Sequence, residues 1–195
     1  VKEDGGKNDL LERIAADVRE VAALAEKHGK PVDIHLHEPG ELGAFTMELI
    51  LERTAALGMQ GKVGVSHAFH LAMVHPDRTT ELLARIAELD VSIYSTGHPS
   101  AAIPSLKAMR AAGVHVGIGC DGIRDTWGPW GQPDMLPRAR VGGMKNGLRR
   151  DDELEMLLDT ASGAGAASIG VHGHALEQGA AADITLVAGE TLAHA

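Results

Sequence analysis

The stretch 31–38, Pro-Val-Asp-Ile-His-Leu-His-Glu, carries several side chains that can bind a metal ion or move a proton. Apolar residues alternate in it with Asp33, His35 and His37, and Glu38 follows directly. This alternation predicts a strand with one apolar face and one face that bears two imidazoles. In a barrel of parallel strands the polar face would look into the lumen near the catalytic rim. The alternative is an edge strand whose histidines lie in water.

Composition narrows the classes of protein. The chain has 195 residues, enough for one domain with a core, and its net charge of −9 argues against a nucleic acid polymer as partner. Its apolar runs are too short to span a membrane, and no secretory segment opens the chain. The single cysteine, Cys120, fits a reducing compartment, so we expect a cytoplasmic protein without a membrane partner. Eleven histidines favour metal or acid–base chemistry.

Strand and helix patterns alternate along the chain. Helical spacing begins at about residue 8, with Asn8 or Asp9 as the cap, and Asp77 or Thr79 can cap a later helix. Such alternation with short connections is typical of parallel βαβ units. The predicted strands are 31–37, 62–66, 91–95 and 114–120, with a short strand in the tail at 179–187. The predicted helices are 8–28, 42–57, 77–89, 103–112, 135–145 and 151–161.

Three of the four main predicted strands end in a residue that can bind metal or transfer protons. These residues are His35 with Glu38, His67 and Asp121. Parallel strands place their carboxyl ends on one rim, so we expect these side chains to converge although they lie far apart in sequence. An alternative for His67 is a buried histidine that bonds a backbone carbonyl.

The order of the motifs resembles a known family. The motifs are His35-x-x-Glu38, Ser66-His67, Gly119-Cys120-Asp121, and Gly179-x-x-x-Asp183 before a hydrophobic strand. Over residues 10–188 the chain is similar to the C-terminal half of cytosine deaminases, which are metal-dependent (β/α)8 barrels of the amidohydrolase superfamily. The implied fold is α/β: the second half of a TIM barrel, with about four parallel strands and their helices, plus a C-terminal strand of a small β-sandwich. The implied boundaries are 1–176 for the half-barrel and 177–195 for the sandwich segment.

The resemblance implies a role for each matching residue. His35 and Asp121 would hold one divalent metal, Zn²⁺ or Fe²⁺, and Asp121 would also orient the attacking oxygen. Glu38 would relay a proton to the ring nitrogen of the substrate. His67 would hydrogen-bond the metal-bound hydroxide or the developing oxyanion. The implied reaction, in the intact protein, is hydrolytic deamination of a heterocyclic amidine such as cytosine or a related pyrimidine or triazine. The small-molecule heterocycle is the expected partner, and the intact protein is expected to be a homo-oligomer.

The same resemblance assigns three residues to the substrate pocket. Trp127 would form a wall, although packing within its own loop is the alternative, and His98 follows a strand end that can face the substrate. Gly122 stands where cytosine deaminases usually have a second Asp. This difference puts cytosine itself in doubt and leaves other cyclic amidines open.

Two alternatives compete with this interpretation. If 31–37 were the first barrel strand, His35 and His37 would both be metal ligands. A long helical segment precedes the stretch, however, and only about 85 residues separate it from Asp121, which is too few for a whole barrel. We therefore favour the fifth strand, and a chain that is a piece of a longer enzyme. The rival functions are a cyclic-amide hydrolase of the same superfamily and a non-catalytic, metal-free binding domain.

Overall fold

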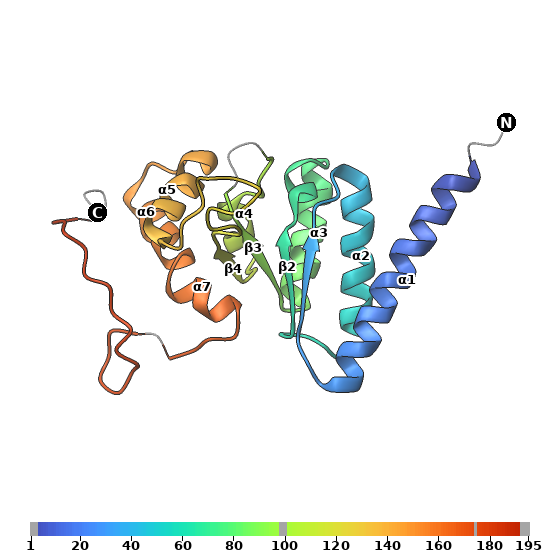
Figure 1. Cartoon of the computed structure of the whole chain (residues 1–195), viewed down its shortest axis with the longest axis horizontal. Coiled ribbons are helices and arrows are strands. Elements are labelled where there is room, and N and C mark those ends of the chain that lie inside the picture. Colours follow the sequence, from blue (N-terminus) through green and yellow to red (C-terminus); the bar gives the residue numbers. More distant parts are fainter. Residues whose placement is uncertain (1–3, 98–100, 174, 192–195) are drawn as a thin grey trace.

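A parallel sheet of four strands forms the centre of the protein (Figure 1), seen in a computed structural model that describes residues 4–97, 101–173 and 175–191. The strands pair in the order β1-β2-β3-β4, and every pairing is parallel. This is the arrangement that the alternation of strands and helices predicted. The strands are β1 (Val32–Leu36), β2 (Val63–His67), β3 (Val91–Ser95) and β4 (Val116–Ile118).

Helices connect the strands and continue beyond the last one. In Figure 1 the helices that precede β2 lie to the right of β1, and the helices that follow β4 lie to its left. No helix in the part of the chain that the structure describes is long and apolar enough to cross a membrane. The α-helices are α1 (Asp4–His28), α2 (Gly40–Ala56), α3 (Pro76–Glu88), α4 (Leu106–Ala111), α5 (Met135–Asn146), α6 (Asp151–Thr160) and α7 (Gly163–Ser168), and η1 (Phe69–Ala72) is a 3₁₀ helix.

Two helix caps differ from the sequence prediction. Helix α1 begins at Asp4, so neither Asn8 nor Asp9 is its cap. Helix α3 is capped by His75, whose side chain accepts a hydrogen bond from the backbone N–H of Asp77. Pro76 occupies the first position of α3, where its missing N–H costs nothing, and this residue fixes the start before Asp77.

Two short helices were not predicted, and one predicted strand is absent. Helices η1 and α7 span only 4 and 6 residues, and neither sequence shows a helical period of large apolar residues. Residues 175–191 contain no strand, although a strand was expected before residue 188. Leu186 is 93% exposed there, and a strand forms only where a second strand offers hydrogen bonds.

The core lies between the sheet and helices α2, α3 and α4. Alternate residues of each strand point toward these helices, and Val65, Val91, Ile93 and Val116 are fully buried. Their helical partners include Met47, Leu82 and Met109, also buried. The residues between these buried ones point to the other face of the sheet and are smaller or polar, as the alternation predicted.

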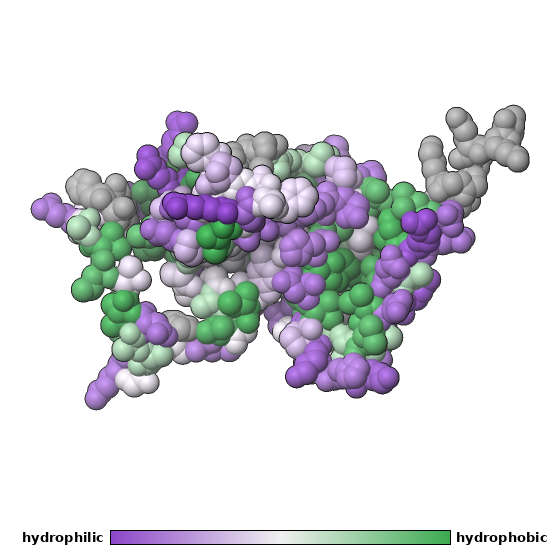
Figure 2. Space-filling model, viewed as in Figure 1, coloured by the Kyte–Doolittle hydropathy of each residue, from purple (hydrophilic) through white to green (hydrophobic). Residues whose placement is uncertain are grey.

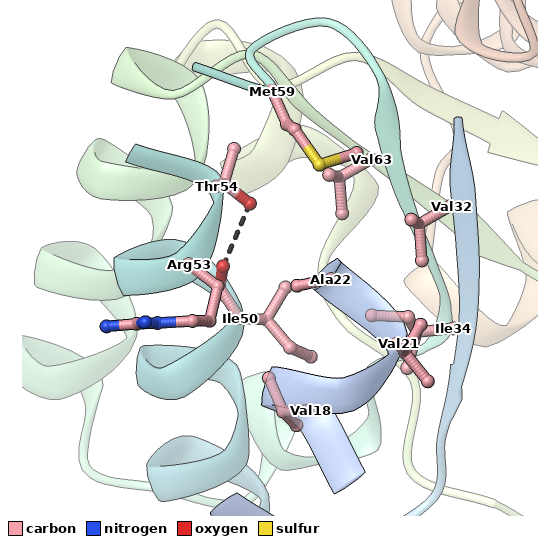
Figure 3. A pocket seen from close by; sticks show the side chains of 10 residues that line it. All are labelled: Val18, Val21, Ala22, Val32, Ile34, Ile50, Arg53, Thr54, Met59 and Val63. Atoms are coloured by element: carbon pink, nitrogen blue, oxygen red, sulfur yellow. Dashed lines mark hydrogen bonds between the residues drawn. The ribbon is translucent and has the colours of Figure 1, made fainter. Parts of the chain in front are cut away.

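Helix α1 packs more loosely, beside the free edge of β1. It contacts α2 and β1, and a small apolar cavity lies between the three elements (Figure 3). Leu24 and Val21 on α1 remain half exposed, and Figure 2 shows apolar surface in this part of the molecule. Among the described residues β1 pairs with β2 alone, so its other edge is open. The cavity is lined by Val18, Val21, Ala22, Val32, Ile34, Ile50, Arg53, Thr54, Met59 and Val63.

Helix α7 covers part of the other face of the sheet. It contacts β3 and β4, and the Tyr94 hydroxyl donates a hydrogen bond of 2.9 Å to the carbonyl oxygen of Ser168. Burial and the nearby charge of Asp33 raise the pKa of Tyr94, so the hydroxyl keeps its proton at neutral pH. The ring of Tyr94 fills the space beside Gly64, which has no side chain to compete for it.

We predict that Gly64→Ala destabilises the protein through overpacking. A Cβ at Gly64 would lie 2.4 Å from the Tyr94 hydroxyl oxygen, so the ring and its bond to α7 must shift. The expected loss is about 1–3 kcal/mol of unfolding free energy, measured by urea denaturation. Gly119→Ala is the matched control because a Cβ there meets no atom within 4 Å. Equal losses for both variants would contradict the packing argument.

Candidate active site

Three of the predicted residues come together at the carboxyl ends of the strands. One ligand atom each of His35, His67 and Asp121 lies within 4.8 Å of the other two. His35 and Asp121 are exposed, whereas His67 is buried. The rings of His35 and His67 have centroids 5.1 Å apart. The parallel pairing from β1 to β4 therefore brings a residue of β1, a residue of β2 and a residue that follows β4 to one cluster of ligand atoms.

The backbone bends at two of these three residues. His67 has a φ of +72° and Asp121 a φ of +63°, values in the left-handed region that residues other than Gly adopt uncommonly. His67 has the same strand parity as Val63 and Val65, which point into the core. The left-handed turn at His67 breaks this alternation and lets its ring lie beside His35. Each such residue costs on the order of 1–3 kcal/mol, a strain that is common where function requires it.

A third imidazole, that of His37, packs beside the cluster. The ring of His37 lies with its centroid 4.3 Å from that of His67 and stacks on Phe69, with 5.7 Å between centroids and 20° between planes. His37 does not belong to the group of ligand atoms around His35. The geometry therefore favours a supporting position for His37, as the fifth-strand interpretation expects.

Glu38 lies on the loop between β1 and α2 and is half-buried. Its backbone approaches the first turn of α2 closely, since a Cβ at Gly43 would lie 2.1 Å from the Glu38 carbonyl oxygen. The same Cβ would lie 2.6 Å from the Cβ of His70. Glycine at position 43 thus permits the contact that sets the path of the Glu38 loop.

A cavity of about 470 Å³ opens beside Asp121. This volume lies in the usual range for a small-molecule site. Trp127 and Trp130 line it, yet each exposes at least 90% of its surface, so neither packs within its own loop. His98, expected near the substrate, lies outside the described residues. The cavity is lined by Thr96, Cys120, Asp121, Gly122, Asp125, Trp127, Gly128, Trp130, Gly131, Gln132, Asp134, Pro137, Arg138 and Val141.

The space beside Gly122 is already occupied by a carboxylate. A Cβ at Gly122 would lie 2.2 Å from Oδ2 of Asp125. The other oxygen, Oδ1 of Asp125, accepts hydrogen bonds from the backbone N–H groups of Trp127 at 2.9 Å and Gly128 at 3.3 Å. Asp125 therefore fixes the turn that carries Trp127, and Gly122 leaves room for it.

Comparison with known proteins agrees with this arrangement. The family model described as "Amidohydrolase family" matches residues 9–193. This chain belongs to the amidohydrolase family. The family resemblance proposed from the motifs is thereby confirmed at the level of the superfamily.

Relatives of this amidohydrolase include enzymes with named substrates. It is 26% identical over 168 residues to the N-isopropylammelide isopropyl amidohydrolase of Pseudomonas sp. (strain ADP), covering 84% of this chain and 41% of that protein. It is 34% identical over 119 residues to the uncharacterized protein YahJ of Escherichia coli (strain K12), covering 60% of this chain and 26% of that protein. The chain thus spans less than half the length of these curated relatives.

Solved structures show the same fold. The N-isopropylammelide isopropylaminohydrolase of Burkholderia multivorans ATCC 17616 superposes with a TM-score of 0.90 at 47% identity, over 92% of this chain and 46% of that one. The 5-methylcytosine deaminase of Klebsiella pneumoniae, liganded with 5-fluorocytosine, gives a TM-score of 0.80 at 19% identity, over 92% of this chain and 47% of that one. The chain therefore has the architecture of half of such an enzyme, a partial (β/α)8 barrel.

The donor set of this amidohydrolase fits a divalent metal. Two imidazole nitrogens and one carboxylate oxygen are ligands that zinc and iron both accept. His67 is a third potential ligand, in addition to the two that the sequence comparison implied. Its burial places it on the protein side of the cluster, whereas His35 and Asp121 face the open side.

Sequence reasoning gave no individual role to several residues at the site. Asp125, Arg138 and Thr96 all line the cavity, and the Thr96 hydroxyl is buried without a hydrogen-bond partner among the described residues. Arg138 belongs to no motif with a recognisable spacing, whereas Asp125 and Thr96 lie in loops that follow predicted strands. Only the Asp125-Thr126-Trp127-Gly128 turn pattern carried a local signal, because aspartate two residues before a backbone N–H often accepts its hydrogen bond.

His70 lies next to the site as a buried neutral histidine. Its side chain is fully buried, and neither ring nitrogen has a hydrogen-bond partner among the described residues. Burial lowers the pKa of His70 to about 4, because the charged ring would lose its hydration. The ring packs against the Gly43 turn of α2, three residues after His67.

We predict that His70 makes the protein acid-sensitive. Between the ordinary pKa of 6.5 and the folded value of about 4, the unfolded chain binds a proton that the folded protein does not. Stability therefore falls as the pH is lowered through this window, by an amount on the order of 2–3 kcal/mol from this group. Urea denaturation at pH 7 and pH 4.5 should show a smaller loss for His70→Leu than for the wild type. A variant with an unchanged loss would contradict this assignment.

Proposed function

We propose that the intact protein is a metal-dependent hydrolase that removes an amino or alkylamino group from a heterocyclic amidine, a pyrimidine or triazine. Water adds at the ring carbon that bears the nitrogen substituent, the carbon–nitrogen bond breaks, and ammonia or an amine leaves. The observation that carries this proposal is the convergence of His35, His67 and Asp121 at one rim of an amidohydrolase sheet.

The relatives support the choice of substrate class. Two of the proteins described above are named for removal of an isopropylamino group from N-isopropylammelide, and one of them is 47% identical to this chain. The cavity beside Asp121 has apolar walls at Trp127 and Trp130, on which a flat ring can lie. N-isopropylammelide and similar N-alkylated rings are therefore our preferred substrates over cytosine.

Each residue at the rim has a task in this proposal. His35 and Asp121 would hold the metal ion, Zn²⁺ or Fe²⁺, which supplies an activated water at neutral pH when bound. Glu38 would take a proton from the attacking water and return it to the ring nitrogen, a task that needs a carboxylate. His67 would donate a hydrogen bond to the oxygen that gains negative charge. Gly122, Trp127 and His98 would border the substrate.

The division of the chain is part of the proposal. Residues 1–176 would form the second half of a (β/α)8 barrel, and residues 177–195 would belong to a small β-sandwich. The free edge of β1 and the exposed apolar residues of the tail support this division, because both need further strands to be covered. The first test of function is metal content together with amine release by the intact protein.

We predict that Glu38→Gln abolishes turnover and keeps the metal. The amide has nearly the same shape but cannot accept and return a proton, so kcat should fall by about 10²–10⁴-fold. Metal content by atomic absorption should stay within a third of the wild-type value. Glu41→Gln, in the first turn of α2, is the matched control and should retain normal activity. Near-normal kcat for Glu38→Gln would assign the proton transfer to another group.

We predict that cytosine is a poor substrate compared with an N-alkylated aminotriazine. An apolar alkyl group can gain about 1–3 kcal/mol in a fitting pocket, which corresponds to roughly 10–200-fold in kcat/KM. The measurement is kcat/KM for cytosine, 5-methylcytosine and N-isopropylammelide with the same enzyme preparation. Trp127→Ala should reduce the preference if the indole forms the wall. A higher kcat/KM for cytosine than for the alkylated ring would contradict this substrate assignment.

A further inference from the structure

Arg138 joins the ends of two strands at the candidate active site. It lies in the first turns of α5, and its guanidinium donates two hydrogen bonds to backbone carbonyls. Nη1 donates to the carbonyl oxygen of Thr96 at 3.0 Å, and Nη2 donates to that of Cys120 at 3.2 Å. Thr96 directly follows β3, and Cys120 directly precedes Asp121. One side chain thus connects the loops that leave β3 and β4.

Arg138 forms no ion pair in the part of the chain that the structure describes. No carboxylate of the described residues lies within salt-bridge distance of it, although α6 nearby is rich in such pairs. The guanidinium is half-buried and lines the cavity beside Asp121. The two hydrogen bonds to carbonyl oxygens replace part of the water that the half-buried guanidinium gives up. Here both bonds go to the strand ends.

Helix α5 is itself held firmly, so Arg138 can act as a fixed support. Asp134 caps its first turn, with Oδ1 accepting from the N–H of Leu136 at 3.1 Å. Close contacts fix the middle of the helix, since a Cβ at Gly97 would lie 3.2 Å from the Cα of Gly142. A Cβ at Gly142 would in turn lie 3.0 Å from Ile118 on β4.

We infer that Arg138 is a positioning residue that sets Asp121 for metal binding. This inference rests on the proposed function. A peptide unit is planar, so a bond that fixes the Cys120 carbonyl also fixes the nitrogen and Cα of Asp121. Asp121 needs such a restraint because its backbone is in the left-handed region and its side chain is exposed. The second bond ties this peptide to the Thr96 peptide, and so sets Asp121 relative to the end of β3.

The planar fork of arginine is suited to this task. Its two terminal nitrogens reach two acceptors at a fixed separation, whereas the single ammonium of lysine can serve only one of them well. Metal sites depend on such outer contacts, and their loss commonly lowers metal affinity by about 10–100-fold. Arg138→Lys therefore separates the role of the fork from that of the charge.

The test is the zinc dissociation constant of the intact protein, measured by competition with a chromophoric chelator. Arg138→Met and Arg138→Lys should each weaken zinc binding by about 10–100-fold. Arg140 lies on the same helix and is exposed, so Arg140→Met and Arg140→Lys are matched controls with unchanged affinity. The visible spectrum of the Co²⁺-loaded protein should change shape in Arg138→Lys and remain unchanged in Arg140→Lys.

A merely structural role would give a different result. In that case the melting temperature of the metal-free protein would fall, while zinc affinity and the Co²⁺ spectrum would match the wild type. That outcome, or wild-type affinity in Arg138→Lys, would overturn the inference. If Arg138→Met does not fold, Arg138→Lys decides alone, because it keeps the charge and the helix propensity. A wild-type protein that binds no metal would contradict the proposed function itself, and the inference would fall with it.

Discussion

The parallel hydrogen-bonded ladder from β1 to β4 is the constraint on which the site depends. Its register places the ends of all four strands on one rim, so residues more than 80 positions apart in sequence meet within 4.8 Å. The strand pairing brings these three side chains together, and their neighbours in sequence alone would not do so. A shift by one residue would turn every side chain of a strand to the opposite face. The core residues Val65, Ile93 and Val116 oppose such a shift because they would have to leave the buried side of the sheet.

The arrangement of strands could be predicted because strand patterns and helical spacing alternate along the chain, which is typical of parallel βαβ units. Alternation in 31–37 predicted the two faces of the first strand. Gly29 and Gly58 directly follow the predicted helices 8–28 and 42–57, and both have a positive φ in the structure. The convergence of His35, His67 and Asp121 then followed from parallel topology alone. Helix starts were predicted less well, since at α3 the residue that caps the helix is a histidine, which propensity does not favour.

The details of the site could not be predicted from the sequence because they depend on backbone conformation and long-range contacts. No pattern reveals that His67 adopts a left-handed φ, although its strand parity alone would turn the ring toward the core. Asp125 filling the space beside Gly122, and Arg138 reaching two strand ends, are contacts between separate parts of the chain. The missing side chain at Gly122 was visible in the sequence. The carboxylate that takes its place became visible only when the turn at Trp127 was placed in space.

The charged side chains at the rim relate the contacts of Asp125 to those of Arg138. Asp121 and Asp125 bring two carboxylates to one side of the cavity, and the half-buried Arg138 lies on the wall of the same cavity. The arginine bonds backbone carbonyls and leaves both carboxylates without its direct contact, so Asp121 remains available to a cation. Had Arg138 paired with Asp121, the carboxylate would have been occupied and the group of three ligand atoms would lack its only anion. The carbonyl oxygens of Thr96 and Cys120 thus hold the guanidinium of Arg138 beside the loop of Asp121. The guanidinium makes no direct contact with the carboxylate that it positions.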